Sequence, residues 1–351
     1  MRACVLAIFF ILSALNTDIL GLTDAQAKDL NQPTFEFRDA LEKAQIMTRL
    51  HSLLVSWDGQ PVLEQYFNGT TQRQLANVKS VSKSWISALV GIAIEQGYIE
   101  SVQQPISDYF AEVLSEDDNA LKRRITIEDL LTMQSGLETT SNRNYGAWVQ
   151  NKNWVDYALS QPLELHPGTT MEYSTGNTHL LSAILTLATD TTTLEFARQT
   201  LTKSLGFRLA PWPQDPQGIY FGGNDMEMTP RQMMKFGELY RNNGWVDDRQ
   251  VIPPDWVNKS LQAHTESTRE NGRFYGYGWW IRKMGGFTTP YAWGYGGQFI
   301  LLVPALDLTI VTTSSSNPGA GRRAHTRSVY DLVEHSIVLP ASSAIEKWKE
   351  F

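Results

Sequence analysis

Hydrophobic residues follow two different spacings along the chain. Near both ends they alternate with polar residues or form short continuous runs, which is typical of β-strands, whereas in the middle they recur every three or four residues, which is typical of helices. Asp58-Gly59 separates two strand-like segments and favours a hairpin turn. The expected strands are 51–57, 61–67, 275–281, 298–303 and 308–313, and the expected helices are 37–50, 84–97, one starting after Thr126, 154–159, 180–188, 193–204, 230–240 and 324–337.

Strands at both ends with helices between them predict an α+β protein. One antiparallel sheet would be built from both ends of the chain and would carry a large helical insertion. We expect the sheet subdomain to span about 35–79 and 270–351 and the helical subdomain about 80–269. A cleft is expected where the two subdomains meet.

The segment from Ser84 to Ile94 contains no charged side chain, so a helix drawn through it is apolar nearly all round and must be buried. Lys83 would therefore enter the core, where an ammonium group is costly unless it has a partner or loses its proton. Residues three apart share a helix face, which brings Lys83 to the hydroxyl of Ser80. A serine beside an amine base predicts a nucleophile. The alternative is that Ser80 only caps the helix and Lys83 extends to solvent.

Composition adds limits to this picture. The 351 residues carry a formal net charge of -7, and 42% are hydrophobic, which is ordinary for a soluble globular protein. No basic block occurs, so we expect no nucleic-acid partner. Residues 1–27 combine a basic start, a short apolar run and Ala25-Gln26-Ala27, which predicts a secretory signal peptide. The mature chain, 28–351, would then be periplasmic or secreted, without a stable membrane span and without Cys4, the single cysteine.

Tyr173 is a candidate proton carrier. It follows the loop-forming His166-Pro167-Gly168. A phenol beside a lysine ammonium would have its phenolate favoured and could move a proton to and from a serine. The alternative is a tyrosine that only packs a loop.

A third segment, 291–297, has aromatic residues at period two, with Trp293 and Tyr295 on one strand face, followed by Gly296 and Gly297. Paired glycines allow a ligand or a second backbone to approach closely. The segment is a candidate binding edge or, alternatively, a packing face of the sheet.

Taken in order, these segments resemble the class C beta-lactamase-like serine hydrolases, whose motifs are S-x-x-K, Y-x-N and K-T-G. Segments 127–137, 228–237 and 294–300 also resemble family segments, and the last is similar to the 6-aminohexanoate-dimer hydrolase and esterase branch. The resemblance implies a beta-lactamase/transpeptidase-like fold, with a five-stranded antiparallel sheet, flanking terminal helices and an inserted helical domain. It implies that Ser80 is acylated, that Lys83 activates it, and that Tyr173 is the general base and acid.

Two departures from the family motifs bear on the substrate. Thr175 stands where Y-x-N has asparagine, with Asn177 two residues further on. Gly294-Tyr295-Gly296 stands where the family has K-T-G, and no Lys or Arg occurs between Lys283 and Arg322. The strand beside the cleft therefore lacks the cation that would pair with a beta-lactam carboxylate, unless Arg322 or Arg323 replaces it.

The sequence thus predicts a serine hydrolase that cleaves a small-molecule ester or small amide through an acyl-enzyme. Backbone N–H groups of Ser80 and of the strand near Gly297 would hold the oxyanion. No metal or cofactor is expected, and neither H-E-x-x-H nor G-x-S-x-G occurs. Three alternatives remain: a D-amino-acid peptidase or carboxypeptidase, a weak beta-lactamase of the cell envelope, and an inactive binding module on the same scaffold.

Overall fold

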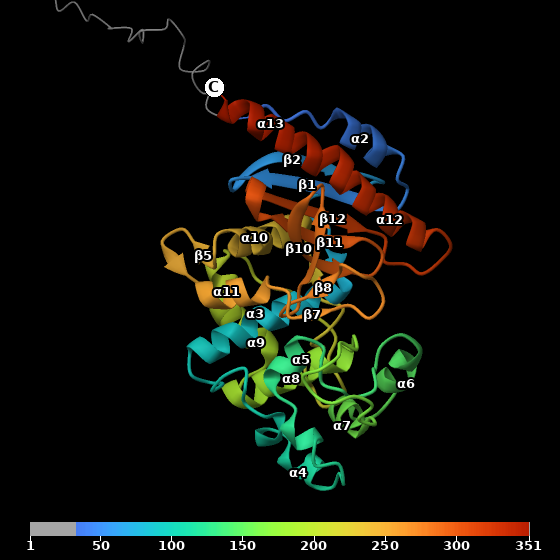
Figure 1. Ribbon diagram of the computed structural model, residues 1–351, viewed down its shortest axis with the longest axis vertical. Helices are drawn as coiled ribbons and strands as arrows, with labels where there is room; N and C mark the ends of the chain where they lie inside the picture. The colour runs from blue at the N-terminus through green and yellow to red at the C-terminus, as the bar shows by residue number, and fades with distance from the viewer. Residues whose placement is uncertain (1–32, 351) are drawn as a thin grey trace, which may run out of the picture.

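The computed structural model describes residues 33–350. The predicted signal peptide, 1–27, and Cys4 lie outside the described residues. Figure 1 shows a β-sheet at one end of the molecule, with terminal helices on its outer side and a helical region beyond its other side. No helix in residues 33–350 is long and apolar enough to cross a membrane.

The sheet has eight antiparallel strands in the order β2-β1-β12-β11-β10-β9-β8-β7. The expectation of five strands is therefore wrong in its number. Two of the additional strands are only two residues long, too short to give a recognisable alternation. The strands are β1 (Leu50–Trp57), β2 (Gln60–Tyr66), β7 (Thr265–Glu266), β8 (Phe274–Tyr275), β9 (Trp280–Met284), β10 (Phe287–Gly294), β11 (Gln298–Val303) and β12 (Leu308–Ser314).

The strand expected at 275–281 is interrupted. A loop between β8 and β9 carries Gly276 and Gly278, and Gly278 has a φ of +78°. A Cβ at Gly278 would lie 2.9 Å from the carbonyl oxygen of Lys83. The chain therefore leaves the sheet here because it passes close to the helix that carries Lys83.

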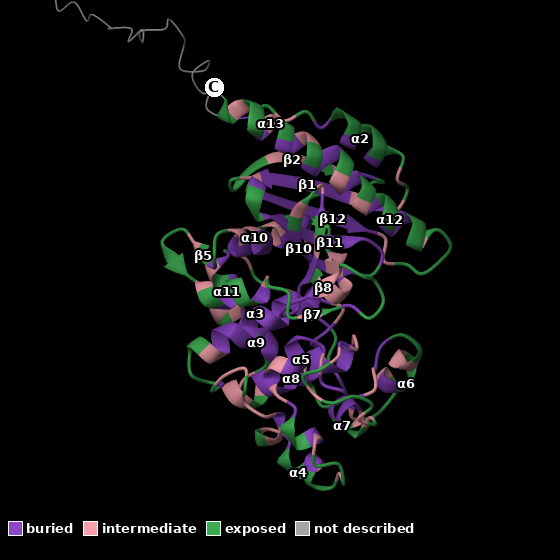
Figure 2. Ribbon diagram, viewed as in Figure 1, coloured by how far each residue is buried: buried purple, intermediate pink, exposed green. Residues whose placement is uncertain are grey.

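Alternate residues of a strand point to opposite faces of the sheet, and the two faces pack against different helices. Leu53 and Val55 of β1 pack with α2, α12 and α13, whereas Leu54 packs in the larger core with α3 and α10. Figure 2 shows β1, β12 and α3 largely buried, whereas the edge strand β2 is only partly buried and the outer side of α13 is exposed. The bounds of these helices are α2 (Arg38–Gln45), α3 (Ser82–Glu95), α10 (Pro230–Arg241), α12 (Arg322–Val333) and α13 (Leu339–Lys349).

The helical region consists mostly of short helices around α3 and α8. Helix α8 begins at Thr175, five residues before the expected start, because its first turn is polar and hydrophobic spacing begins only at Leu180. Helix α5 begins after Thr126, as the sequence predicted, and Thr126 caps it through a capping box with Asp129. The helices are α4 (Ala111–Ser115), α5 (Ile127–Leu131), α6 (Tyr145–Val149), α7 (Trp154–Ser160), α8 (Thr175–Thr189), α9 (Thr193–Ala197) and α11 (Pro254–Ser260).

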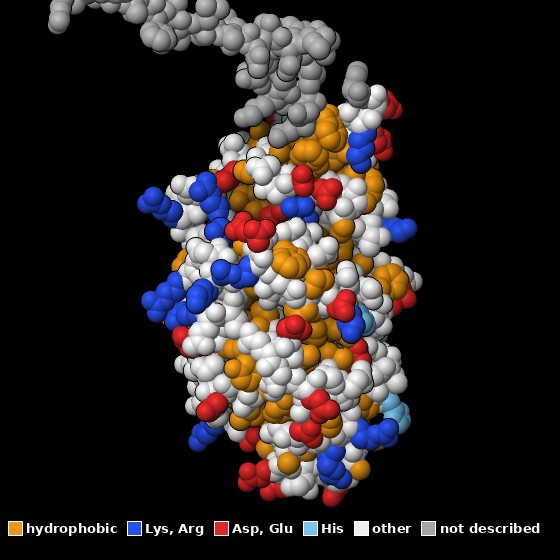
Figure 3. All heavy atoms as spheres, turned by 90° about the vertical axis from the view of Figure 1, so that its left-hand side faces the viewer, with side chains coloured by type: hydrophobic (Ala, Val, Ile, Leu, Met, Phe, Trp, Pro, Cys, Tyr) orange, Lys and Arg blue, Asp and Glu red, His pale blue; other side chains and the backbone are white. Residues whose placement is uncertain are grey.

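Figure 3 views the molecule from the side of β5 (Trp245–Val246). On this face acidic and basic side chains are interspersed around exposed hydrophobic atoms. A cavity of about 600 Å³ lies between the β1–β2 hairpin and α10. Four of its charged residues form ion pairs, Arg231 with Glu64 at 2.8 Å and Arg241 with Glu238 at 2.6 Å.

Candidate active site

Ser80 and Lys83 lie at the start of the most buried helix. Ser80 is in a single 3₁₀ turn, Lys79–Val81, that leads directly into α3. Lys83 is 1% exposed, and its Nζ is 3.2 Å from Ser80 Oγ. Backbone N–H groups in a first helical turn have no intrahelical acceptor, so the Ser80 N–H is a candidate oxyanion donor.

The Lys83 amine is held by two further oxygen atoms. Its Nζ lies 2.6 Å from the carbonyl oxygen of Gly223 and 3.4 Å from Thr175 Oγ1. Burial lowers the pKa of Lys83 to about 7, and the charge of Asp225 opposes this shift. A neutral amine has two N–H donors and one lone pair. If the donors serve Gly223 and Thr175, the lone pair faces Ser80.

The residue before Ser80 has an unusual backbone conformation that its neighbours stabilise. Lys79 has a φ of +51°. Asn77 Oδ1 accepts a hydrogen bond from the Lys79 N–H, and the Lys79 ammonium pairs with Asp225 Oδ1 at 2.7 Å. The same carboxylate accepts from Asn77 Nδ2. Asp225 therefore supports the turn that carries Ser80 and also adds negative charge near Lys83.

Tyr173 lies directly before α8 and is half-buried. Its ring is 5.1 Å from Lys83 Nζ and stacks on Trp280, with the ring centroids 5.5 Å apart. Burial raises the pKa of Tyr173 to about 12, although a hydrogen bond with Ser80 opposes the shift. The expectation of a favoured phenolate is therefore wrong, because desolvation outweighs the stabilising contacts.

The structure brings Thr175 to this group but not Asn177. Thr175 is 5% exposed and contacts Ser141 Oγ at 2.8 Å as well as Lys83. Asn177 is also buried, and its Oδ1 accepts a hydrogen bond from Ser135. Asn177 therefore joins α8 to the segment that follows α5.

The segment 294–297 forms the turn between β10 and β11. A Cβ at Gly294 would lie 2.1 Å from the carbonyl oxygen of Val78, so the turn passes next to the segment that leads to Ser80. Gly296 and Gly297 have φ values of +94° and +111°. The Gly297 N–H, expected to help hold an oxyanion, donates to the carbonyl oxygen of Gly294 at 3.3 Å.

Two arginine side chains lie near the β10–β11 turn and the neighbouring strands. Tyr295 is 38% exposed, and the guanidinium of Arg322 stacks 3.9 Å from its ring centre. Arg273 stacks 3.8 Å from the ring of Trp280 and 5.0 Å from the ring of Trp293. Arg273 was not predicted from the sequence because it lies outside every motif. It forms an ion pair at 3.2 Å with Glu270, which is three residues earlier in the chain.

Gly223 and Asp225 were also missed. They belong to a Gly222-Gly223-Asn224-Asp225 segment, whose paired glycines were the available signal for a close backbone contact. Across residues 33–350, no cluster of three or more His, Cys, Asp or Glu residues is arranged to hold a metal ion.

Comparison with known proteins identifies the family. The family model described as "Beta-lactamase" matches residues 44–334. The chain therefore belongs to the beta-lactamase family, within the superfamily of serine hydrolases that the sequence resembles.

Relatives of known identity are distant. The 6-aminohexanoate-dimer hydrolase of Paenarthrobacter ureafaciens is 25% identical over 282 residues, which cover 73% of this chain and 70% of that protein. A putative 6-aminohexanoate-dimer hydrolase from Bacillus anthracis has a similar structure, with a TM-score of 0.67 and 20% identity over 85% of this chain and 81% of that one. A putative beta-lactamase from Bacteroides dorei gives a TM-score of 0.70 at 15% identity, over 90% and 99%. At these identities the solved structures establish the fold.

Proposed function

We propose that this protein is a secreted serine hydrolase that cleaves an ester or a small amide through an acyl-enzyme on Ser80. The observation that carries the proposal is the Lys83 amine, which is buried, lies 3.2 Å from Ser80 Oγ and has its pKa lowered to about 7. At neutral pH a large fraction of this amine is unprotonated and can accept the serine proton.

In the acylation step, Ser80 Oγ attacks the substrate carbonyl carbon and its proton passes to Lys83. Tyr173, protonated because its pKa is raised to about 12, donates its proton to the leaving oxygen or nitrogen. The bond to the leaving group then breaks. The products are an acyl-serine, a Lys83 ammonium, a Tyr173 phenolate and the free alcohol or amine.

Deacylation returns both protons. The Tyr173 phenolate takes a proton from water while the water oxygen attacks the acyl carbon. Ser80 Oγ leaves and recovers its proton from Lys83. The acid is released and the enzyme regains its starting protonation state, so the cycle balances with one water consumed.

The proposal is tested with a fluorophosphonate probe and with 4-nitrophenyl butyrate. We expect the probe to label Ser80, as located by mass mapping, and the ester to be hydrolysed. Ser80→Ala should lose both reactions while keeping the fold, since the Ser80 side chain makes no helix-capping hydrogen bond and the substitution removes a single hydroxyl group. Labelling at another serine, or hydrolysis by Ser80→Ala at the wild-type rate, would refute the assignment.

A D-amino-acid peptidase or weak beta-lactamase is the second candidate. It is favoured by Arg322, whose guanidinium stacks on Tyr295 at the β10–β11 turn and could pair with a substrate carboxylate. Turnover of D-amino-acid peptides without turnover of esters would select this candidate.

Secretion is proposed from residues 1–27 alone. Expression of the full chain followed by N-terminal sequencing of the periplasmic and extracellular protein tests it. A mature chain that begins at Lys28 is expected, whereas an uncleaved chain retained in the cytoplasm would contradict the proposal.

A further inference from the structure

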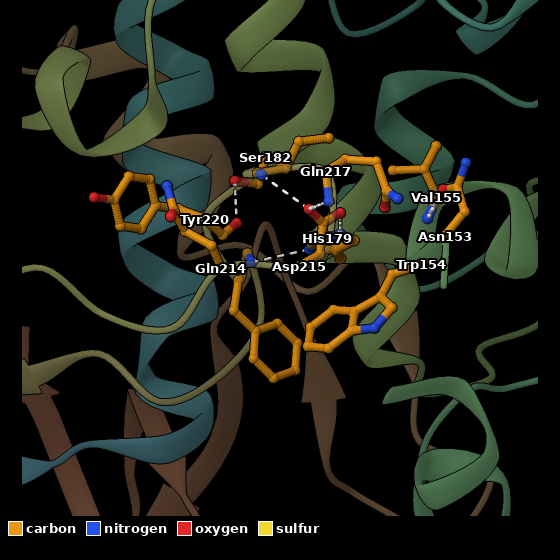
Figure 4. A network of polar contacts seen from close by, with 12 residues as sticks. Asn153, Trp154, Val155, His179, Ser182, Gln214, Asp215, Gln217 and Tyr220 are labelled. Carbon is orange, nitrogen blue, oxygen red and sulfur yellow. Dashed lines mark hydrogen bonds and ion pairs between the residues drawn. The ribbon is translucent and has the colours of Figure 1, made fainter. Parts of the chain in front are cut away.

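A fully buried histidine–aspartate pair lies behind the proposed active site. His179 is on α8, one turn after Thr175, and its Nε2 is 3.0 Å from Asp215 Oδ2 (Figure 4). Both side chains are 0% exposed. The rings of Trp148, Trp154 and Phe221 surround the imidazole, with centroids 5.4 to 5.9 Å away. Burying such a pair is expensive unless every polar atom is satisfied, and the proposed mechanism does not use it.

The hydrogen bonds select one tautomer of His179. Asp215 Oδ1 accepts from the backbone N–H groups of Gln217 and Ile219, so Oδ2 is left for His179 Nε2, which must donate. The other ring nitrogen, Nδ1, accepts a hydrogen bond from the backbone N–H of Gly222 at 3.4 Å. Both contacts are satisfied only by a neutral imidazole with its proton on Nε2.

Gly222 is joined by its peptide bond to Gly223, whose carbonyl oxygen lies 2.6 Å from Lys83 Nζ. Both glycines are needed for close approach, since a Cβ at Gly222 would lie 2.0 Å from the Thr178 carbonyl oxygen and one at Gly223 would lie 2.4 Å from Thr178 Oγ1. Two consecutive glycines have large conformational freedom. The hydrogen bond from the Gly222 N–H to His179 Nδ1 restricts this freedom between the two glycines and the helix.

We propose that His179, oriented by Asp215, is a positioning residue that fixes the Gly223 carbonyl against the Lys83 amine. Thr175 and His179 then lie on the same face of α8, because residues four apart on a helix are neighbours, and both affect the Lys83 amine. Thr175 contacts the amine directly, and His179 holds the segment that supplies its second oxygen atom. The inference rests on the proposed function of Lys83 as the base that activates Ser80.

The inference predicts a change in pH dependence. A carbonyl that accepts from Lys83 stabilises the ammonium more than the amine, so loss of this acceptor lowers the pKa of Lys83. The groups that face Lys83 from neighbouring elements are the Asp225 carboxylate, which pairs with Lys79, and the Tyr173 phenol. Because these remain in place, the acid limb of the reaction should move to lower pH while the maximal rate falls.

Asp215→Asn is the most selective variant. Its Oδ1 can still accept from Gln217 and Ile219, but its NH₂ group then faces His179 Nε2 and forces the proton onto Nδ1. Nδ1–H and the Gly222 N–H would be two donors facing each other. His179→Asn is the matched control, because its side-chain oxygen occupies the place of Nδ1 and can still accept from Gly222, although the contact with Asp215 is lost.

The rate of fluorophosphonate labelling at Ser80 is measured against pH, together with thermal melting. Both variants should melt at lower temperature than the wild type. We expect Asp215→Asn to label about 10- to 100-fold more slowly, with its acid limb at lower pH, since small misplacements of catalytic groups cost rates of this order. His179→Asn should keep the wild-type acid limb.

Equal losses in both variants with unchanged acid limbs would overturn the inference and leave a purely structural role. If the wild-type protein is not labelled at all, the proposed function fails, and crystal structures of the two variants decide the inference separately. It is supported if the Gly223–Lys83 contact is kept in His179→Asn and lost in Asp215→Asn. It is overturned if both variants keep the contact.

Discussion

At the scale of single residues, the proposed chemistry depends on the charge state of Lys83. Its position could be predicted from the sequence because an uncharged run follows it. The groups that tune it could not be predicted, since Gly223 and Asp225 are more than 100 positions away in the chain and act through hydrogen bonding and charge. Burial lowers the pKa of Lys83, and Asp225 raises it by a smaller amount.

Asp225→Asn tests this balance. The carboxylate favours the Lys83 ammonium, so its removal should lower the pKa of Lys83 further. The amine would then be unprotonated at lower pH, and the acid limb of fluorophosphonate labelling should shift to lower pH. Asp248→Asn, a change of the same charge at an exposed position, is the control and should leave the limb in place. A shift to higher pH, or equal shifts in the two variants, would contradict the assignment.

Lys83 and Tyr173 are expected to act as one unit with Ser80. Lys83→Met and Tyr173→Phe should each lower the rate of hydrolysis of an alkyl ester, whose leaving oxygen must be protonated, nearly as much as the double variant does, because members of one proton-transfer unit are strongly non-additive. Tyr275→Phe is the matched control, since Tyr275 packs 6.1 Å from the Tyr173 ring but is not part of the proton path. Effects that simply multiply in the double variant would show independent roles.

At the scale of elements, prediction succeeded where hydrophobic spacing was regular. The predicted bounds of β11 agree with the structure. The hairpin at Asp58-Gly59 and the buried helix α3 are also present where they were predicted, within two residues. It failed where backbone geometry depends on distant contacts. Gly278 lies next to the Lys83 carbonyl group, and Gly294 lies next to that of Val78. Such tertiary contacts produce no periodic pattern in the sequence. Introducing the missing lysine of K-T-G at Gly294 is therefore unsuitable, because its Cβ would lie 2.1 Å from a carbonyl oxygen.

Close packing of α10 on the sheet gives a stability test. A Cβ at Gly237 would lie 2.6 Å from Thr309 Cγ2 and 2.8 Å from Ile300 Cγ2. We expect Gly237→Ala to lower the free energy of unfolding by about 1 to 3 kcal/mol, as overpacking does. Gly146→Ala, in α6 with no atom within 4 Å of the new Cβ, should be neutral or stabilising by up to about 1 kcal/mol. Denaturant unfolding of both variants measures the difference.

At the scale of the whole molecule, the candidate site joins parts that are far apart in the chain. Ser80 comes from the 3₁₀ turn before α3 and Lys83 from α3 itself. Tyr173 comes from the segment before α8, Gly223 from a later loop and the glycine turn from the sheet. The sequence could indicate each segment separately, and the resemblance to a family supplied their combination. The cations at the sheet edge follow only from the folded chain, since Arg273 and Arg322 belong to different elements.

The position of these cations predicts substrate choice. Arg273 stacks on Trp280, pairs with Glu270 through Nη1 and has its Nε and Nη2 atoms buried, so this guanidinium is held within the protein rather than exposed at the β10–β11 turn. Arg322 is then the cation at the β10–β11 turn that could reach a carboxylate, and it lies on α12 rather than on the strand. Without a strand cation, a carboxylate-bearing beta-lactam should be bound less well than a neutral ester of similar size.

We therefore expect 4-nitrophenyl butyrate to be hydrolysed with a kcat/KM about 30- to 5,000-fold above that of nitrocefin, because losing one partner of a hydrogen-bonded ion pair costs about 2 to 5 kcal/mol. Arg322→Gln should lower residual nitrocefin turnover more than ester turnover, with the exposed Arg231→Gln as the matched control. Nitrocefin turnover equal to that of the ester, and abolished by Arg322→Gln, would show that Arg322 already binds the carboxylate. The ester assignment would then give way to a beta-lactamase or peptidase.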